Sequence, residues 1–284
     1  MNVLSLFDGM SCGQIALNRL GIKVDKYYAS EIDKYAIQIT QKNYPDTIQV
    51  GDITKLNPND FKDIDLIMAG SPCQGFSFAG KQLAFDDPRS ALFFEFIRLL
   101  KAIKPKYFLL ENVRMKKEYL EVITEQVSQC YPNEGNDLFN TRIEPILINS
   151  ALVSAQNRVR YYWTNIPKMK QPNDRNIILK DILEDNYIAD REKSYCIDAN
   201  YFRGGNLKRY FLRCSRQLVF LNNDYKEFRK LYPEEVESLQ TVPKGYTHGV
   251  SNMQRYKMLG NGWTVDVICH ILKNMEKRID EKCN

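Results

Sequence analysis

The chain has 284 residues, of which 44% are hydrophobic and 26% are charged, and its formal net charge is +5. This composition is ordinary for a soluble globular protein and predicts one large domain, or one domain with a small second lobe. The small positive net charge favours an anionic binding partner only weakly. No apolar run approaches the ~20 residues of a membrane span, and the N-terminus lacks a signal-peptide pattern. We therefore expect an intracellular, cytoplasmic protein.

The cysteines and histidines limit the chemistry that is available. The seven cysteines form no C-x-x-C pair, which argues against zinc-ribbon and thioredoxin-like proteins. Only two histidines are present, His248 and His270, so there is little material for a Ser-His or Cys-His nucleophile pair. We expect free thiols and no metal site.

In chain order, the first half alternates apolar runs of strand length with amphipathic runs of helix length. Strands are predicted over residues 2–7, 25–32, 47–52, 65–70 and 106–112, with helices over 13–21, 34–44, 90–104 and 116–130 between them. This alternation predicts an α/β fold with a doubly wound, mostly parallel sheet. Two further strands are expected over 141–150 and 158–165, and two further helices over 233–240 and 264–279.

The alternation fades after Pro167, where proline, glycine and asparagine interrupt shorter elements. We place a small second lobe over residues 167–231. The catalytic domain is then predicted to comprise residues 1–166 and 232–284.

The ends of the first three predicted strands carry a glycine turn and two acidic residues. Gly9 and Gly13 allow close backbone approach, Glu31 ends the second strand, and Asp52 ends the third. The dinucleotide fingerprint G-x-G-x-x-G is absent, which counts against NAD or FAD. Each feature alone fits an ordinary turn or a helix cap. Together they suit an adenosine-containing ligand without a pyrophosphate, because ligands of such sheets bind beyond the carboxyl ends of the strands.

The next two strand ends carry reactive groups. "SPCQGFS" places Cys73 after the fourth strand, and Glu111 lies near the end of the fifth. A thiolate is a strong nucleophile, and a glutamate can supply a proton. "QNRVR" then puts Arg158 and Arg160 on a probable strand, where each could bind a carbonyl, a carboxylate or a phosphate. A buried thiol, a helix cap and a solvated strand face are the alternatives for the single motifs.

These blocks resemble, in order, those of the DNA cytosine-5 methyltransferase family. The resemblance runs from Leu6 to the last helix, interrupted by the second lobe, over "LFDGMSCG", "SEI", "GDI", "SPCQGFS", "LLENV", "QNRVR" and "LGNGWTVDVI". "LGIKVDKYYASE", "LFFEF", "VSNM" and "GWTV" are similar to the animal de novo branch. The resemblance implies a Rossmann-like class I methyltransferase fold, S-adenosylmethionine as cofactor, and a bacterium or a phage-infected host as the setting.

The resemblance also implies roles for residues. Cys73 is the nucleophile that attacks ring carbon 6, Glu111 the cytosine-binding acid, Arg160 the base-side arginine and Arg158 the phosphate-side arginine. The candidate cofactor-binding residues are Phe7, Asp8, Gly9, Gly13, Glu31, Ile32, Asp52, Ile53, Pro72, Asn261 and Trp263.

Duplex DNA is the expected partner, and its target cytosine must be flipped out of the helix to reach Cys73. The predicted lid spans residues 74–89, with Gln74, Ser77, Lys81 and Arg89 as candidate DNA contacts. In the basic stretch 201–216 of the second lobe, the candidates are Arg203, Gly204, Gly205, Lys208, Arg209 and Arg213. A solvated basic hairpin is the alternative for that stretch. The acidic stretch 181–192 is expected to face solvent away from DNA.

Several alternatives stay open at this point. A catalytically silent DNA-binding relative would not need Cys73, Glu111 and both arginines together. An RNA cytosine-5 methyltransferase could share the fold, whereas a thiol redox protein would need a second cysteine. A short recognition site is expected from the short lobe. Monomer and dimer both remain open, as does a companion restriction nuclease.

Overall fold

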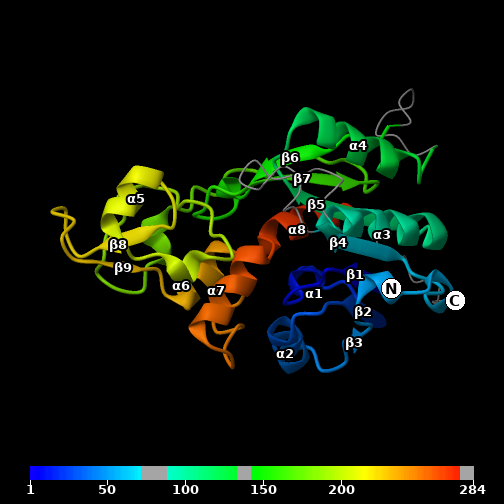
Figure 1. Cartoon of the computed structure of the whole chain (residues 1–284), viewed down its shortest axis with the longest axis horizontal. Coiled ribbons are helices and arrows are strands. Elements are labelled where there is room, and N and C mark those ends of the chain that lie inside the picture. Colours follow the sequence, from blue (N-terminus) through cyan, green and yellow to red (C-terminus); the bar gives the residue numbers. More distant parts are fainter. Residues whose placement is uncertain (72–87, 133–141, 276–284) are drawn as a thin grey trace, which may run out of the picture.

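A seven-stranded, mostly parallel sheet forms the centre of the protein (Figure 1). The computed structural model describes residues 1–71, 88–132 and 142–275. The strand order is β3-β2-β1-β4-β5-β7-β6. The strands are β1 (Asn2–Leu6), β2 (Lys26–Ser30), β3 (Ile48–Gln49), β4 (Leu66–Gly70), β5 (Tyr107–Val113), β6 (Ile146–Asn149) and β7 (Val159–Thr164). β1 to β5 pair in parallel, whereas β7 runs antiparallel to β5 and to β6.

Helices cover both faces of this sheet, as the sequence predicts for a doubly wound fold. Alternate residues of each strand enter opposite cores: Leu66 and Met68 of β4 pack with the helices of one face, Ile67 and Ala69 with those of the other. The first face carries α1 (Cys12–Arg19), α2 (Lys34–Asn43) and α8 (Val265–Leu272), and the second carries α3 (Pro88–Ile103) and α4 (Lys117–Ser128). The predicted fold class is therefore confirmed.

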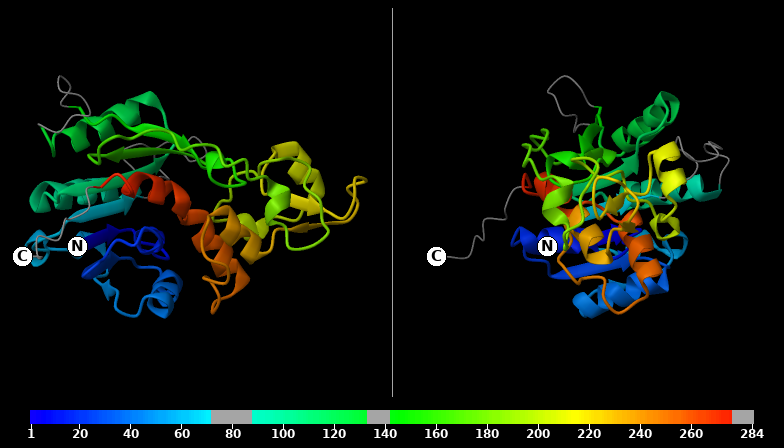
Figure 2. Two further views of the ribbon diagram at one scale, coloured as in Figure 1. Left: turned by 180° about the vertical axis from the view of Figure 1, so that it is seen from behind. Right: turned by 90° about the vertical axis from the view of Figure 1, so that its left-hand side faces the viewer.

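A smaller lobe projects from the end of the molecule opposite the N-terminus (Figures 1 and 2). It contains α5 (Leu207–Arg213), β8 (Leu218–Phe220) and β9 (Phe228–Lys230), and it continues into α6 (Pro233–Leu239) and α7 (Asn252–Asn261). Tyr210, Leu218 and Phe220 form a small core of its own. Leu179 and Leu231, at the two sides of the lobe, belong to the larger core of the sheet. The boundaries 167 and 231 stay a prediction.

Three local expectations differ from the structure. The third strand shortens to two residues, since Gly51 turns the chain with a φ of +77° and Asp52 begins the 3-10 helix η1 (Ile53–Lys55). The hairpin considered for 201–216 is wrong: the stretch forms the 3-10 helix η6 (Tyr201–Arg203) and α5, where the Asn206 side chain accepts from the backbone N–H of Arg209. Helix α7 was not expected.

The acidic stretch 181–192 does not simply face solvent, which corrects the sequence-based expectation. Asp185 forms an ion pair with Arg229 of β9 at 2.8 Å. Asp190 accepts from the Tyr210 hydroxyl and the Gln217 amide. Both aspartates thus hold the lobe together. Within the part of the chain that the structure describes, no helix combines the length and apolar character needed to cross a membrane.

Candidate functional site

A cleft of about 380 Å³ lies at the carboxyl edge of the parallel strands. Its volume falls in the range of about 300–1,000 Å³ that small-molecule sites occupy. The predicted residues that line it are Phe7, Asp8, Gly9, Glu31, Ile32, Asp52, Ile53, Glu111, Arg158, Arg160, Asn261 and Trp263. The fold therefore brings the expected cofactor residues and the described members of the reactive set into one cavity.

The loop after β1 forms the inner wall of the cleft and is bent tightly. Phe7, Gly9 and Ser11 have φ values of +57°, +59° and +62°, and such values are strained for Phe7 and Ser11. The N–H of Gly9 donates to the Glu31 carboxylate at 2.8 Å, which joins this loop to the end of β2. Gly13 is not among the residues found to line the cleft. A Cβ there would lie 2.5 Å from Cε of Met68, so the glycine lets α1 pack on β4.

The side chain of Asp8 turns inward and stabilises the loop. Its carboxylate accepts from the Ser11 hydroxyl and from the Tyr27 hydroxyl, the latter at 2.8 Å. Burial raises the pKa of Asp8 to about 6, although these hydrogen bonds oppose the shift. Asp8 was expected to bind cofactor, but its carboxylate is already engaged with the loop.

Two further acids stand at the strand ends with fixed orientations. Glu31 accepts from the backbone N–H groups of Ile32 and Asp33 at 2.7 and 2.8 Å. Asp52 accepts from the backbone and the hydroxyl of Thr54, and these bonds hold the pKa of its carboxyl below the usual range. Ile32 is 77% exposed at the rim of the cleft. The cleft thus offers carboxylates beside an apolar rim.

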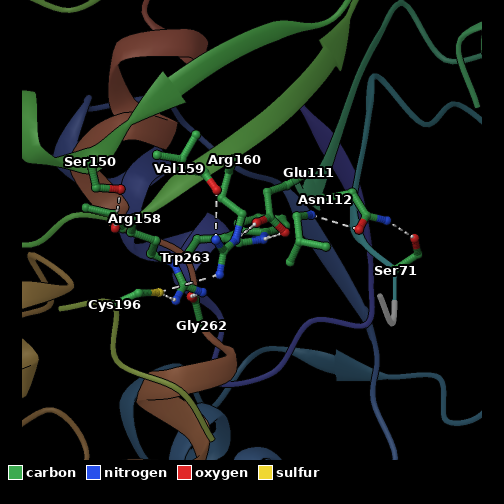
Figure 3. Close-up of polar contacts among 12 residues, drawn as sticks. Ser71, Glu111, Asn112, Ser150, Arg158, Val159, Arg160, Cys196, Gly262 and Trp263 are labelled. Atoms are coloured by element: carbon green, nitrogen blue, oxygen red, sulfur yellow. Dashed lines mark hydrogen bonds and ion pairs between the residues drawn. The ribbon is translucent and has the colours of Figure 1, made fainter. Parts of the chain in front are cut away.

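The opposite end of the cleft contains a compact cluster around Glu111 (Figure 3). Glu111 is 8% exposed, and Nε of Arg160 lies 2.9 Å from its Oε1. The indole N–H of Trp263 donates to Oε2 at 3.2 Å. The neighbouring Asn112 donates to the Ser71 hydroxyl at 3.0 Å, which ties β5 to the residue before the Pro-Cys pair. The cluster places one carboxylate between a guanidinium and an indole.

Arg158 occupies a different position from the phosphate contact expected for it. Its residue exposure is 4%, and its guanidinium donates to the carbonyl oxygens of Ile197, Gly260 and Gly262 at 3.1, 3.2 and 2.7 Å. Ile197 belongs to residues 167–231 of the predicted lobe, and Gly260 and Gly262 lie at the end of α7. Arg158, directly before β7, therefore joins the sheet, the lobe and the Trp263 segment from within the protein.

Some predicted residues lie outside the described part of the chain: Pro72, Cys73, Gln74, Ser77 and Lys81. Arg89 falls in the first turn of α3, and its side chain also lies outside the description. In the lobe, Arg203, Lys208, Arg209 and Arg213 are all exposed. Gly205 has a φ of +109°, and with Gly204 it lines a small hollow beside Arg203 and Arg209.

Three contacts of the site were not foreseen from sequence. Trp263 was expected at the cofactor, yet its indole N–H bonds Glu111. Lys257 of α7 pairs with Asp33 at 2.7 Å, and both line the cleft. Cys196, which belongs to no motif, lies against the two arginines. The sequence motifs around these residues do not indicate the contacts, because the partners are distant in the sequence. No group of three or more His, Cys, Asp or Glu side chains is gathered for a metal within the described ranges.

Solved structures of methyltransferases share the Rossmann-like fold of this chain. The S. pombe Dnmt2 methyltransferase has a TM-score of 0.72 with 21% identity, over 96% of this chain and 97% of that one. A putative DNA modification methyltransferase encoded within an E. coli prophage has a TM-score of 0.63 with 22% identity, over 96% and 98%.

The sequence identifies the family. The model described as C-5 cytosine-specific DNA methylase matches residues 1–195 and 139–277. The chain belongs to this family and is a DNA (cytosine-5) methyltransferase. Two type II methyltransferases are 29% identical over 96% of this chain: M1.ScrFI of Lactococcus lactis subsp. cremoris, of which 77% is covered, and M.NlaX of Neisseria lactamica, of which 96% is covered.

Proposed function

We propose that this enzyme transfers the methyl group of S-adenosylmethionine to carbon 5 of a cytosine flipped out of duplex DNA, with Cys73 as the covalent nucleophile. The observation that carries the proposal is the Glu111–Arg160–Trp263 cluster, which shares one cleft with Glu31 and Asp52. Glu111 would bind the base, and Glu31 and Asp52 would bind the nucleoside part of the cofactor. Because all three line one cavity, the two molecules would be held close enough for methyl transfer.

The residues of the cleft fit the proposed cofactor. Glu31 has both oxygens oriented by backbone N–H groups, so the remaining lone pairs are fixed for ribose hydroxyls. Ile32 and Ile53 supply apolar surface for an adenine ring. Asn261 and Trp263 complete the wall toward Glu111. S-adenosylmethionine bound there supplies an electrophilic methyl group.

The proposed chemistry uses the chain's own groups to activate the base. The Cys73 thiolate forms a bond to carbon 6, and the electrons of the carbon 5–carbon 6 double bond become available at carbon 5. Glu111 holds a proton at ring nitrogen 3, while Arg160 stabilises charge at the adjacent carbonyl. Carbon 5 gains the methyl group with S-adenosylhomocysteine as the leaving group. Loss of the carbon 5 proton to solvent then re-forms the double bond and releases Cys73 as thiolate.

The lobe is proposed to select the cytosine. The exposed cations Arg203, Lys208, Arg209 and Arg213 supply phosphate and guanine contacts, and Gly204–Gly205 permits close backbone approach. Residues 74–89, with Gln74, Ser77, Lys81 and Arg89, are proposed as the lid over the flipped base. A cytoplasmic location is also proposed, together with a companion restriction nuclease, which the type II names of two relatives favour.

The deciding experiment incubates the enzyme with labelled S-adenosylmethionine and a duplex that contains 5-fluorocytosine. The expected result is methyl transfer followed by a stable protein–DNA adduct, because fluorine at carbon 5 prevents the final proton loss. Cys73→Ser should abolish the adduct and the transfer. Methylation that persists in Cys73→Ser would overturn the covalent mechanism, and transfer to RNA but not to DNA would overturn the substrate assignment.

A further inference from the structure

The sulfur of Cys196 lies against the guanidinium groups of both arginines of the site (Figure 3). Nη1 of Arg158 is 3.5 Å from Sγ, and Nη2 of Arg160 is 3.9 Å from it. Both distances are within hydrogen-bonding range for sulfur. Arg160 is the arginine that pairs with Glu111, so Cys196 is one side chain removed from the proposed base-binding carboxylate.

The backbone around Cys196 is fixed to the segment that precedes these arginines. The N–H of Ser194 donates to the carbonyl of Ala155 at 2.7 Å, and the N–H of Ile197 donates to the Gln156 side chain at 2.9 Å. The carbonyl of Ile197 in turn accepts from Arg158. The backbone of Cys196 therefore stands at a defined position within residues 167–231, and its exposed side chain brings the sulfur to the two arginines.

We propose that Cys196 is a positioning residue for Arg160, whose guanidinium it holds in the orientation that pairs with Glu111. The inference rests on the proposed function, since it assigns a role to Arg160 at the cytosine. The three groups of Arg160 that are accounted for each have a different partner: Nε contacts Glu111, Nη1 donates to the carbonyl of Val159 at 2.8 Å, and Nη2 faces the sulfur. The sulfur is thus one contact that restrains the Nη2 side of the guanidinium.

The charges around the sulfur support this role. Burial raises the pKa of the Cys196 thiol, but the positive charges and hydrogen bonds of Arg158 and Arg160 outweigh it and bring the pKa below its ordinary value. On the far side of Arg160, its Nε pairs with Glu111, and Asp198 on the same segment as Cys196 faces Arg216 at 3.9 Å. A thiolate holds a guanidinium more strongly than a thiol does, because the hydrogen bond becomes charge-assisted.

The test compares Cys196→Ala, which removes the acceptor, with Cys196→Ser, which keeps one. Cys130→Ala is the matched control, because it removes a thiol buried behind α4 and away from the cleft. The measurements are kcat and the KM for S-adenosylmethionine on duplex DNA, from about pH 6 to about pH 9. We expect Cys196→Ala to lower kcat about tenfold with little change in KM, Cys196→Ser to retain most of kcat, and the control to match the wild type.

The pH profile separates positioning from a merely structural role. The ratio of wild-type kcat to that of Cys196→Ser should fall as the pH drops through the pKa of the Cys196 thiol, because the two enzymes differ only at this residue. A kcat of Cys196→Ala within twofold of the wild type would overturn the inference, as would equal loss in both variants or a ratio that does not change with pH.

A second readout does not depend on activity. The side-chain Nε–H of Arg160, labelled with ¹⁵N and assigned from its loss in Arg160→Lys, should exchange faster with solvent in Cys196→Ala than in Cys196→Ser. An unchanged exchange rate in Cys196→Ala would overturn the inference even if the wild type proved inactive. A wild type without methyl transfer would by contrast overturn the proposed function.

Discussion

Replacing Glu111 with glutamine removes one negative charge and changes the shape of the cluster very little. The amide oxygen of glutamine can still accept from Arg160, but the amide N–H₂ group then faces the Trp263 indole N–H, which loses its acceptor. The Arg160 guanidinium loses its ionic partner, but its side chain is 15% exposed, so water compensates in part. We therefore expect the free energy of unfolding to fall by only ~1–2 kcal/mol, less than the ~3–5 kcal/mol that follows when one partner of a fully buried ion pair is removed.

The effect on turnover should be much larger. Glutamine cannot hold the proton at ring nitrogen 3, and a positioned acid is worth ~100-fold to 10,000-fold in rate. We expect kcat to fall about 100-fold or more, while calorimetry gives the affinity for S-adenosylmethionine within about threefold of the wild type. Glu121→Gln is the control, because Glu121 also pairs with an arginine, Arg142, but lies on α4. Lost cofactor binding in Glu111→Gln, or near-normal turnover, would refute the assigned role.

Three further outcomes follow from the same structure. Arg158→Met should lower the free energy of unfolding in urea by ~3 kcal/mol, since buried carbonyls lose their donor; a change below ~1 kcal/mol would contradict its place as an internal link. The raised pKa of Asp8 means that its folded form retains a proton which the unfolded form has lost. Stability should therefore decline by ~3 kcal/mol between about pH 4 and 6, and this decline should vanish in Asp8→Asn when melts are compared. Lys208→Ala and Arg209→Ala should be compared on a set of duplexes: a phosphate contact weakens all sites equally, and a guanine contact relaxes one position.

Much of the site could be predicted because parallel strands end at the same edge of a sheet. Glu31, Asp52 and Glu111 each follow or end an apolar run, so a doubly wound sheet necessarily brings them to one side. The strand order then sets which strand ends are neighbours: β1 and β4 are adjacent at the centre of the sheet. Acidic residues at strand ends can be predicted from the sequence, since the pattern of hydrophobic residues indicates where each strand ends.

Other residues could not be assigned because their roles depend on partners far along the chain. Asp8 lines the cleft, but its carboxylate accepts from the hydroxyls of Ser11 and Tyr27, which the sequence does not indicate. The alternating arginines read as one exposed strand face, but the carbonyls of Gly260 and Gly262 lie where Arg158 can reach them, and only Arg160 faces Glu111. Arg158 and Arg160, which occupy equivalent positions of one motif, therefore have different contacts.

The sequence by itself determined the fold class, the family and the edge of the sheet that holds the site, because hydrophobic period and motif order act locally along the chain. Only the tertiary structure decided which polar groups meet. It placed Cys196 beside Arg160, turned the basic stretch of the lobe into α5, and set Trp263 against Glu111. The physical reason is that a buried polar group must find a hydrogen-bond partner, and for these side chains the partner lies far along the chain.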